Sequence, residues 1–379
     1  MKPNLKLSLS SICLFLFFQT TIIAQTTQPT FSHIVIVIGE NTRASSVYGS
    51  TSAPYINALA AQGAKFTNSF GVFHPSQPNY IALYSGSNQG ITKDNLVTTK
   101  FTTANLGREL INAGKTFTTF SEDLPSVGFD GATSGSYARK HNPAANWMGT
   151  GTNQIPTTTN QPFTAFPTNF NNLPAVSFVI PNLCNDGHNS CAPISNGTLQ
   201  YDTFLKTKLD AYKKWCINNN SLLIVTYDED DFTTVNKIAT VVYGAKVATG
   251  EYAQTINHYS VLRTIENAFG LTTHAGAAAT ATPLNCWITG ASKNAVITSD
   301  TNNLETKISL FPNPVDGATI SVFGIDNNTK YQILNTTGLK MADGILENDS
   351  IPVDKLPKGI YYIQFNQQDK VISKSFIKK

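Results

Sequence analysis

The sequence predicts an α/β fold with a mostly parallel sheet flanked by helices, followed by a small C-terminal β-sandwich. The segment His33–Ile38 is a nearly continuous β-branched run, which is typical of a strand buried on both faces of a parallel sheet. From Lys307 onwards the pattern changes to short alternating strands separated by turn residues, which indicates the sandwich. Further apolar runs like that of His33–Ile38 lie at Thr116–Phe120, Ala175–Ile180, Leu222–Tyr227 and Thr240–Tyr243.

Helical patterns lie between these runs, and the alternation of strands and helices predicts the parallel α/β architecture. The stretch Ser126–Pro174 shows no period, so we expect loops that cover the edge of the sheet. In the last predicted helix, Ser260 is the expected N-cap and Gly270 ends the helix. The predicted helices are Tyr55–Gly63, Asn105–Ala113, Leu199–Ile217 and Ser260–Phe269.

The N-terminal segment has the composition of a signal peptide. Lys2 and Lys6 form a basic start, Ile12–Phe18 an apolar run, and Ala24 a small residue at the expected cleavage site. An uncleaved membrane anchor is the alternative, but the apolar run is short against the ~20 residues that span a bilayer, so we expect no stable span after cleavage. The predicted divisions of the 379 residues are a signal peptide at 1–24, an α/β domain at 25–288, a linker at 289–306 and the β-sandwich at 307–379.

Charge and cysteine content narrow the class of protein. A formal net charge of +3 gives no electrostatic reason to expect nucleic acid binding. Once the signal peptide is removed, four cysteines remain, and an even number in an exported chain fits two disulfides. Cys184 and Cys191 flank one short loop and are the favoured pair, which leaves Cys216 with Cys286. Four unpaired thiols are the alternative, which an oxidising compartment disfavours.

Polar residues follow two of the predicted strands at their carboxyl ends, where open parallel sheets bind their ligands. Glu40 and Asn41 follow the first strand, and Asp228 and Glu229 follow Leu222–Tyr227. Carboxylates this close need a counter-charge, which a divalent metal ion supplies. A solvated turn is the alternative for either pair taken singly. Because both pairs follow buried strands, we favour a metal site.

Ser76 is the candidate nucleophile. It precedes Pro78 and an apolar run, so we expect it at the N-terminus of a helix. A plain N-cap is one interpretation. A nucleophile is the other, because the helix dipole stabilises an alkoxide and binds phosphate, and a nearby metal ion lowers the pKa of the hydroxyl.

The histidines differ in the roles that their positions suggest. His188 forms a short D-x-H with Asp186 on a loop that the Cys184–Cys191 bridge would stiffen, so it is a candidate ligand or general acid, with a surface histidine as the alternative. Two others, His141 and His258, are further candidates for the site. We expect His33 to be structural and His274 to lie on the surface, and the role of His74 is open.

Seven sequence blocks occur in a fixed order between roughly Ser32 and Ala278. In this order they resemble the phosphoesterase family that joins bacterial and fungal acid phosphatases with phospholipases C, a branch of the alkaline phosphatase superfamily. The resemblance implies that 25–288 is a catalytic domain of alkaline phosphatase-like fold. The blocks are Glu40-Asn41, Pro75–Tyr80, Ser121–Pro125, Lys140–Pro143, Pro181–His188, Thr226–Glu229 and His258–Glu266.

The resemblance implies a metal-dependent acid phosphatase that hydrolyses phosphate monoesters through a phosphoserine intermediate. At Lys237 the chain departs from relatives that carry a histidine, which leaves a metal or phosphate role there open. The metal would be one or two divalent ions, of open identity. The implied catalytic residues are Ser76, His188 and His141; the implied substrate-binding residues are Asn79, Asn142 and His258; and the implied metal ligands are Glu40, Asn41, Ser76, Asp228, Glu229 and Asp186.

Two other functions remain as alternatives. A phospholipase C-type phosphodiesterase shares this chemistry, although the compact chain and the block Cys184–His188 favour the phosphatase. A secreted binding protein without activity belongs to another class, and the intact nucleophile and metal candidates argue against it. A sulfatase is disfavoured because the C-x-P-x-R nucleophile motif is absent from the sequence.

The C-terminal segment carries its own set of marks. They are Phe311–Pro314, Asn335–Gly338, Leu356–Tyr361 and the basic ending Lys374–Lys379. In order and spacing they resemble the C-terminal sorting domain of type IX secretion substrates. The resemblance implies the type IX machinery as a partner and a location outside the cell or on its surface, reached through the periplasm. A generic carbohydrate-binding sandwich is the alternative.

Overall fold

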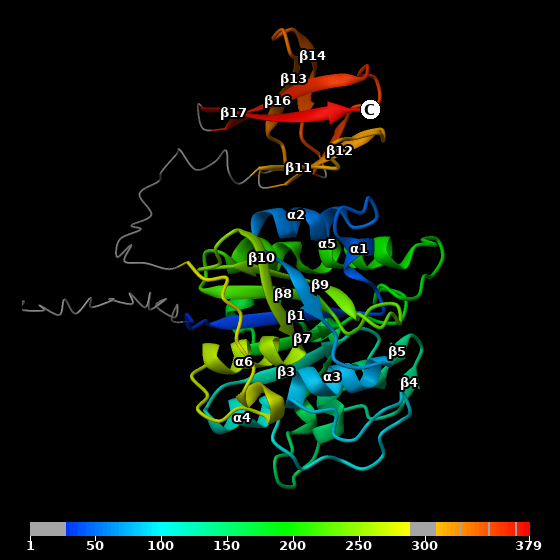
Figure 1. Cartoon of the computed structure of the whole chain (residues 1–379), viewed down its shortest axis with the longest axis vertical. Helices are drawn as coiled ribbons and strands as arrows, with labels where there is room; N and C mark the ends of the chain where they lie inside the picture. Colours follow the sequence, from blue (N-terminus) through cyan, green and yellow to red (C-terminus); the bar gives the residue numbers. More distant parts are fainter. Residues whose placement is uncertain (1–27, 289–307, 324, 326, 348, 368–369) are drawn as a thin grey trace, which may run out of the picture.

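The computed structural model describes residues 28–288, 308–323, 325, 327–347, 349–367 and 370–379 (Figure 1). The predicted signal peptide and linker lie outside the described residues. Within these ranges, every helix is too short or too polar to cross a membrane. The described chain forms one α/β unit, followed by two small antiparallel sheets.

The α/β unit is organised around an eight-stranded, mostly parallel sheet with the order β10-β2-β9-β8-β1-β7-β3-β6. Strand β1, His33–Gly39, lies near the centre and pairs in parallel with β7, Val176–Ile180, and with β8, Ser221–Tyr227. Beyond β7 the sheet continues with β3, Phe117–Ser121, and β6, Asn160–Pro162, both parallel. The predicted class of fold is therefore confirmed.

Both faces of β1 are buried, which explains its unbroken apolar sequence. Ile34 and Ile36 face a core shared with α3, α4 and α6, whereas Val35 and Val37 face a second core shared with α1, α2 and α5. Helices therefore cover the two faces of the sheet (Figure 1). Their bounds are α1 Ala44–Val47, α2 Pro54–Gln62, α3 Ser76–Ser85, α4 Leu106–Asn112, α5 Gly197–Cys216 and α6 His258–Ala268.

Three strands differ from the prediction. The run Thr240–Tyr243 belongs to β9, Lys237–Gly244, which is antiparallel to β8 and not parallel. Its composition could not reveal the direction, because a strand buried on both faces has the same apolar pattern either way. Strands β2, Ala64–Phe70, and β10, Gly250–Asn257, were not predicted, because they are only partly buried and carry polar residues.

The region predicted as loops is largely irregular, and α6 begins earlier than expected. Between Ser126 and Pro174 the chain forms only short 3-10 helices and short strands, among them β4, Thr133–Ser134, and β5, Tyr137–Ala138. Asn257, not Ser260, caps α6: its Oδ1 accepts the N–H group of Tyr259 at 3.0 Å. The Ser260 hydroxyl completes the reciprocal capping box.

The four cysteines in the described part of the chain form one disulfide and not two. Cys184 and Cys191 are bonded, as predicted. Cys216 and Cys286 are free, which corrects the second predicted pair. Cys216 lies in the core with α5, and Cys286 lies in the core on the opposite face of the sheet, so the sheet separates the two thiols. Burial raises the pKa of each to about 12, so both stay protonated and unreactive.

The C-terminal unit is a sandwich of two antiparallel sheets, β11-β12-β15 and β14-β13-β16-β17. Apolar side chains from both sheets form one core, with Val322 and Ile351 from the first sheet against Ile333 and Ile363 from the second. Strand β11 lies beside α2 (Figure 1). The strand bounds are β11 Ser309–Phe311, β12 Thr319–Phe323, β13 Lys330–Asn335, β14 Lys340–Ile345, β15 Ser350–Pro352, β16 Gly359–Gln367 and β17 Lys370–Lys378.

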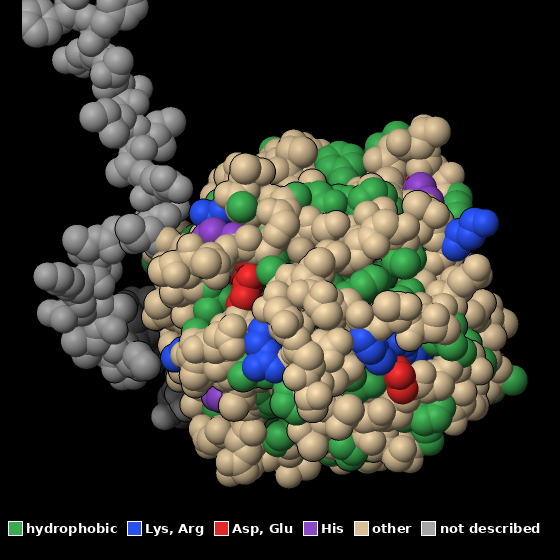
Figure 2. Space-filling model, turned by 90° about the horizontal axis from the view of Figure 1, so that it is seen from below, with side chains coloured by type: hydrophobic (Ala, Val, Ile, Leu, Met, Phe, Trp, Pro, Cys, Tyr) green, Lys and Arg blue, Asp and Glu red, His purple; other side chains and the backbone are tan. Residues whose placement is uncertain are grey.

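The surface reflects the low content of charged residues, 13%. On the face shown in Figure 2, uncharged polar groups and apolar side chains dominate, and charged side chains are scattered singly or in small groups.

A buried carboxyl pair joins α4 to α6, away from the candidate site. The carboxyl of Glu266 accepts the N–H group of Ala275 at 2.9 Å and contacts Nδ1 of His274 at 3.0 Å. Glu109 lies against it, and burial raises the pKa of Glu109 to about 7 and of Glu266 to about 8. The expectation that His274 lies on the surface is thus only partly met, since its ring is half-buried against Glu266.

We predict that the Glu109–Glu266 pair stabilises the protein more at acidic pH than at neutral pH. A carboxyl whose folded pKa is raised stabilises the fold while protonated, so its contribution is lost as the pH rises from its ordinary value of 4.5 through about 8. Glu266→Gln imitates the protonated acid, so its unfolding free energy should fall less over that range than that of the wild type. Denaturant melts at a series of pH values measure this difference. Parallel pH curves for the two proteins would contradict the prediction.

Candidate active site

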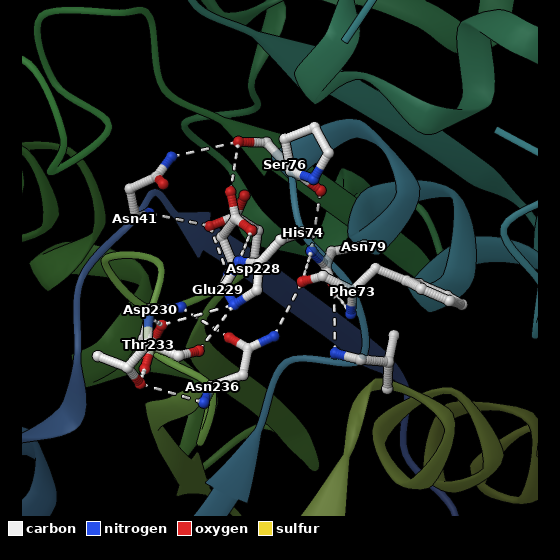
Figure 3. Close-up of polar contacts among 12 residues, drawn as sticks. Asn41, Phe73, His74, Ser76, Asn79, Asp228, Glu229, Asp230, Thr233 and Asn236 are labelled. Atoms are coloured by element: carbon white, nitrogen blue, oxygen red, sulfur yellow. Dashed lines mark hydrogen bonds and ion pairs between the residues drawn. The ribbon is translucent and has the colours of Figure 1, made fainter. Parts of the chain in front are cut away.

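Ser76 opens helix α3, and its hydroxyl lies among acidic groups (Figure 3). Pro75 is the N-cap residue, so the Ser76 side chain makes no cap hydrogen bond. Its Oγ instead lies 3.0 Å from Oε2 of Glu40 and 3.1 Å from Oε1 of Glu229, and it accepts Nδ2 of Asn41 at 3.2 Å. The predicted helix N-terminus is confirmed, but the plain N-cap interpretation is wrong.

Two neighbouring parallel strands deliver these acidic groups. In the register of β1 and β8, Gly39 pairs with Tyr227, so the residues that follow each strand meet at one edge of the sheet. Asn41 and Asp228 are joined there, because the backbone N–H group of Asn41 donates to Oδ1 of Asp228 at 3.0 Å. Asn41 has a φ of 45°, a left-handed conformation that Asn tolerates better than most residues.

The carboxylates are buried, and burial sets their electrostatics. Burial raises the pKa of Glu229 to about 7 and raises that of Asp228 well above its ordinary value. Burial also opposes ionisation of Glu40, but the charges of His141 and Lys140 outweigh it and lower the pKa of that carboxyl. The cluster therefore favours protons or a cation close to Ser76.

The oxygen atoms of this cluster that lack hydrogen-bond partners could bind a divalent cation. Four buried oxygens have no hydrogen-bond partner, namely Oε1 of Glu40, Oδ1 of Asn41, Oδ2 of Asp228 and Oδ2 of Asp186. Carboxylate and amide oxygens are the ligands that hard cations prefer. In the described part of the chain no three His, Cys, Asp or Glu side chains are arranged as a metal site by themselves. The carboxylates here contact Asn41 and Ser76, so the candidate ligand set combines carboxylate, amide and hydroxyl oxygens.

His141 and Asp186 extend the cluster. His141 is buried, stacks on Tyr80 with ring centroids 5.2 Å apart, and places Nε2 2.8 Å from Oε1 of Glu40, without the geometry of a hydrogen bond. Its Nδ1 lies 4.0 Å from Oδ2 of Asp186. The carbonyl of Asp186 accepts the N–H group of Glu40 at 2.8 Å. These contacts place both residues beside the metal candidates.

The other two predicted histidines hydrogen-bond to Asp186 and Asp228 and not to Ser76. The backbone N–H group of His188 donates to Oδ1 of Asp186 at 3.0 Å, while its side chain is exposed. His258 is fully buried, with Nε2 2.5 Å from the backbone carbonyl of Asp228, and burial lowers its pKa to about 4. His258 is thus neutral and supports the backbone of a metal candidate.

The predicted substrate-binding asparagines have other partners. Oδ1 of Asn79 accepts the N–H groups of Val72 and Phe73, both at 2.9 Å, and its Nδ2 donates to the carbonyl groups of Phe73 and Pro75. This amide holds the turn that leads into Ser76.

Asn142 is also committed to protein contacts. Its Nδ2 donates to Oδ1 of Asn160 at 2.8 Å and to Oγ of Ser121 at 3.2 Å. Its amide therefore braces the loops behind His141 and does not contact the Ser76 cluster.

His74 is a site residue whose role the sequence left open. Its Nδ1 contacts Oε2 of Glu229, and its Nε2 lies 3.1 Å from the carbonyl oxygen of Thr233 (Figure 3). Phe232 stacks on its outer face, with ring centroids 5.1 Å apart. The sequence could have indicated His74 as a site residue, because it lies two residues before Ser76 and therefore at the same turn.

Two protein-family models match this chain. The chain belongs to the Phosphoesterase family, whose model matches residues 37–272. Residues 309–379 match the Secretion system C-terminal sorting domain. This domain directs export by type IX secretion to the cell surface or beyond it, as its sequence marks predicted.

Two sequence relatives carry phosphatase names, and with the family match they make this protein a hydrolase that acts on phosphoric esters. The chain is 47% identical over 251 residues to the phosphatidylinositol-3-phosphatase of Mycobacterium tuberculosis, which covers 66% of this chain and 80% of that protein. It is 29% identical over 228 residues to an acid phosphatase of Aspergillus fumigatus, covering 56% of this chain but only 50% of that enzyme. A solved protein of the alkaline phosphatase superfamily from Vibrio parahaemolyticus aligns over 92% of this chain and 83% of its own, with 13% identity and a TM-score of 0.49.

We predict that Asn79 positions Ser76 and does not bind substrate. Asn79→Ala leaves two N–H groups and two carbonyl groups of the turn without partners, which should lower the unfolding free energy by about 1–3 kcal/mol and reduce kcat, with KM little changed. Asn79→Asp keeps the two accepted bonds and should recover part of both losses. Kinetics and thermal melts of the three proteins test this. A raised KM with unchanged stability would instead indicate substrate contact.

Proposed function

We propose that this protein is a secreted, metal-dependent acid phosphatase that hydrolyses phosphate monoesters through a phosphoserine at Ser76. The observation that carries the proposal is the Ser76 hydroxyl at the N-terminus of α3, within hydrogen-bond distance of carboxylates that follow two adjacent strands. Positive charge at the helix N-terminus favours an alkoxide and a phosphate in the same place. The phosphatase names of the two relatives support the choice of monoesters.

The proposed metal ligands are the oxygens of the acidic cluster together with the nucleophile. When bound, a divalent ion supplies positive charge that lowers the hydroxyl pKa and neutralises the phosphate. His141 and Lys140 favour the ionised form of Glu40, and His74 holds the Glu229 carboxylate in place. The ligands would be Glu40, Asn41, Ser76, Asp228 and Glu229, with Asp186 available beside them.

The reaction would proceed in two steps at phosphorus. Oγ of Ser76 forms a bond to phosphorus as the bond to the leaving oxygen breaks. The hydroxyl proton passes to the Glu229 carboxylate, whose Oε1 lies 3.1 Å away, and the leaving alkoxide takes a proton from His188. Water then attacks the phosphoserine and gives a proton to His188, while Oγ of Ser76 leaves phosphorus and takes its proton back from Glu229, which releases inorganic phosphate and restores the hydroxyl. The assignment of His188 as the acid rests on its exposed ring, on the loop closed by Cys184 and Cys191, next to Asp186.

A phosphoinositide monoester is the second candidate substrate, because the relative named phosphatidylinositol-3-phosphatase is 47% identical. A phospholipase C-type diesterase remains the rival activity. Parallel assays of p-nitrophenyl phosphate and of phosphatidylcholine separate monoesterase from diesterase. Turnover of phosphatidylcholine alone would replace the monoesterase proposal.

We predict that Ser76→Ala lowers kcat by on the order of 10³-fold or more, because the proposed covalent intermediate forms on the hydroxyl that this change removes. Acid quenching of the wild type during turnover of a labelled monoester should trap label on the peptide that contains Ser76. Ser46→Ala, which removes an exposed hydroxyl from α1, is the control and should be fully active. Substantial activity in Ser76→Ala would exclude the phosphoserine route.

We predict that removing divalent ions with a chelator abolishes turnover and lowers the thermal midpoint, since the buried carboxylates lose their counter-charge. Adding back single ions should identify the metal that restores both properties. Asn41→Leu removes one proposed ligand and should weaken metal binding in a direct titration. Full activity in protein shown by elemental analysis to be metal-free would refute the metal requirement.

A further inference from the structure

A basic pocket of about 360 Å³ opens beside the proposed site. Arg43, Lys65 and Lys237 line it, together with Tyr48 and Thr233, whose hydroxyl groups donate to the carbonyl of Thr240 and to Asp230. A volume of this size lies in the range of small-molecule sites, roughly 300–1,000 Å³. The pocket therefore brings three cations together in a space that accommodates an anionic group and part of its carrier.

Residues that line the pocket adjoin the cluster around Ser76: Asp230 follows Glu229, and Thr233 contacts His74. Arg43 follows Asn41 by two residues, so their Cα atoms lie at most about 7 Å apart, and Asn41 contacts Ser76. On the other side, His74 contacts the carbonyl of Thr233 with one nitrogen and Glu229 with the other. A ligand in the pocket is thus close enough to belong to the molecule whose phosphate reacts at Ser76.

The cations of the pocket are available to an anion. Arg43 pairs with Asp231, and both side chains are nearly half exposed, at 45% and 43%. Lys65 pairs with Glu251, which is 68% exposed. The single exposed contact of Lys65 is weak. Arg43 holds Asp231 through two contacts, so a phosphate that binds Arg43 has to replace both of them.

The third cation has a different partner. Nζ of Lys237 contacts the amide oxygen of Asn68 at 3.2 Å. The carboxylate of Asp230 also lines the pocket, but it accepts the N–H groups of Thr233 at 2.8 Å and Lys237 at 3.2 Å, so its oxygens are directed into its own loop.

The loop that contributes Thr233 to the pocket also carries two exposed apolar side chains, Phe232 and Val235, here called the apolar lip. Phe232 and Val235 flank Thr233 in the β8–β9 loop and are 63% and 60% exposed. Phe232 is held with a φ of 62°, in the left-handed region, and stacks on His74. Exposed apolar groups next to cations match a ligand with both anionic and apolar parts.

We propose that this pocket binds a second phosphate group of the substrate, carried with the scissile phosphate on one small polyol. The proposal rests on the proposed phosphatase function and names its substrate class. Lys237 and Arg43 would contact the second phosphate, and Arg43 would exchange Asp231 for it. The carrier is either a soluble polyol bisphosphate or a lipid headgroup with one phosphodiester and one phosphomonoester, and only the lipid would use the apolar lip.

The test compares kcat/KM for a soluble polyol bisphosphate with kcat/KM for p-nitrophenyl phosphate. Lys237→Met and Arg43→Met should each lower the ratio of the two values about tenfold, the effect of one lost charge-assisted contact. Lys115→Met, which removes an exposed lysine elsewhere, should leave the ratio unchanged. Calorimetric titration of Ser76→Ala with the bisphosphate, with and without Lys237→Met, measures the same contact without turnover.

The lipid is tested in phosphatidylcholine vesicles that contain the inositol lipid. Replacing Phe232 and Val235 by Ser should lower activity on vesicles and spare the soluble bisphosphate. If Lys237→Met and Arg43→Met lower kcat/KM on either carrier relative to p-nitrophenyl phosphate, the result supports a second-phosphate site in the pocket. The vesicle result shows which carrier the pocket uses. If the ratio is unchanged on both carriers while p-nitrophenyl phosphate is hydrolysed, the pocket proposal is wrong. If the wild type hydrolyses no monoester, the proposed function itself fails.

Discussion

The parallel pairing of β1 with β8 is the constraint on which the site depends. The register that sets Gly39 opposite Tyr227 makes two strands end together, so that Glu40 and Asn41 meet Asp228 and Glu229. A shift of one residue would turn these side chains to the wrong face of the sheet. The apolar residues that bury both faces of the two strands therefore also fix the geometry around Ser76.

This placement is unfavourable in itself, and the surrounding contacts offset it. A carboxylate that is removed from water loses its solvation, so its charged form is disfavoured. The raised pKa values of Asp228 and Glu229 reflect this cost. His141 and His74 approach this cluster from two different loops, and the hydroxyl of Ser76 lies between its members. Such a site is well suited to bind a cation, because a bound metal ion neutralises the buried carboxylates and removes the free-energy cost of their burial.

The sequence predicted what depends on local pattern and order along the chain. The buried strands β1, β3, β7 and β8 and the helices α2, α4, α5 and α6 were predicted from local pattern, whereas α1 was not. The meeting of the polar residues at the carboxyl ends of β1 and β8 was predicted because parallel strands bring their ends together. The direction of β9 could not be predicted, since burial on both faces looks alike in either direction. The missing second disulfide could not be foreseen either, because only the folded sheet shows that Cys216 and Cys286 lie on opposite faces.

The site was less predictable where a polar side chain could face either a ligand or the backbone. Asn79 and His74 lie in one short segment, yet the first holds the turn and the second reaches Glu229. That difference arises in three dimensions, because the loop after β8 folds back over His74 through Thr233 and Phe232. The same loop borders both the Ser76 cluster and the basic pocket, so one connection between two strands joins the proposed chemistry to the proposed choice of substrate.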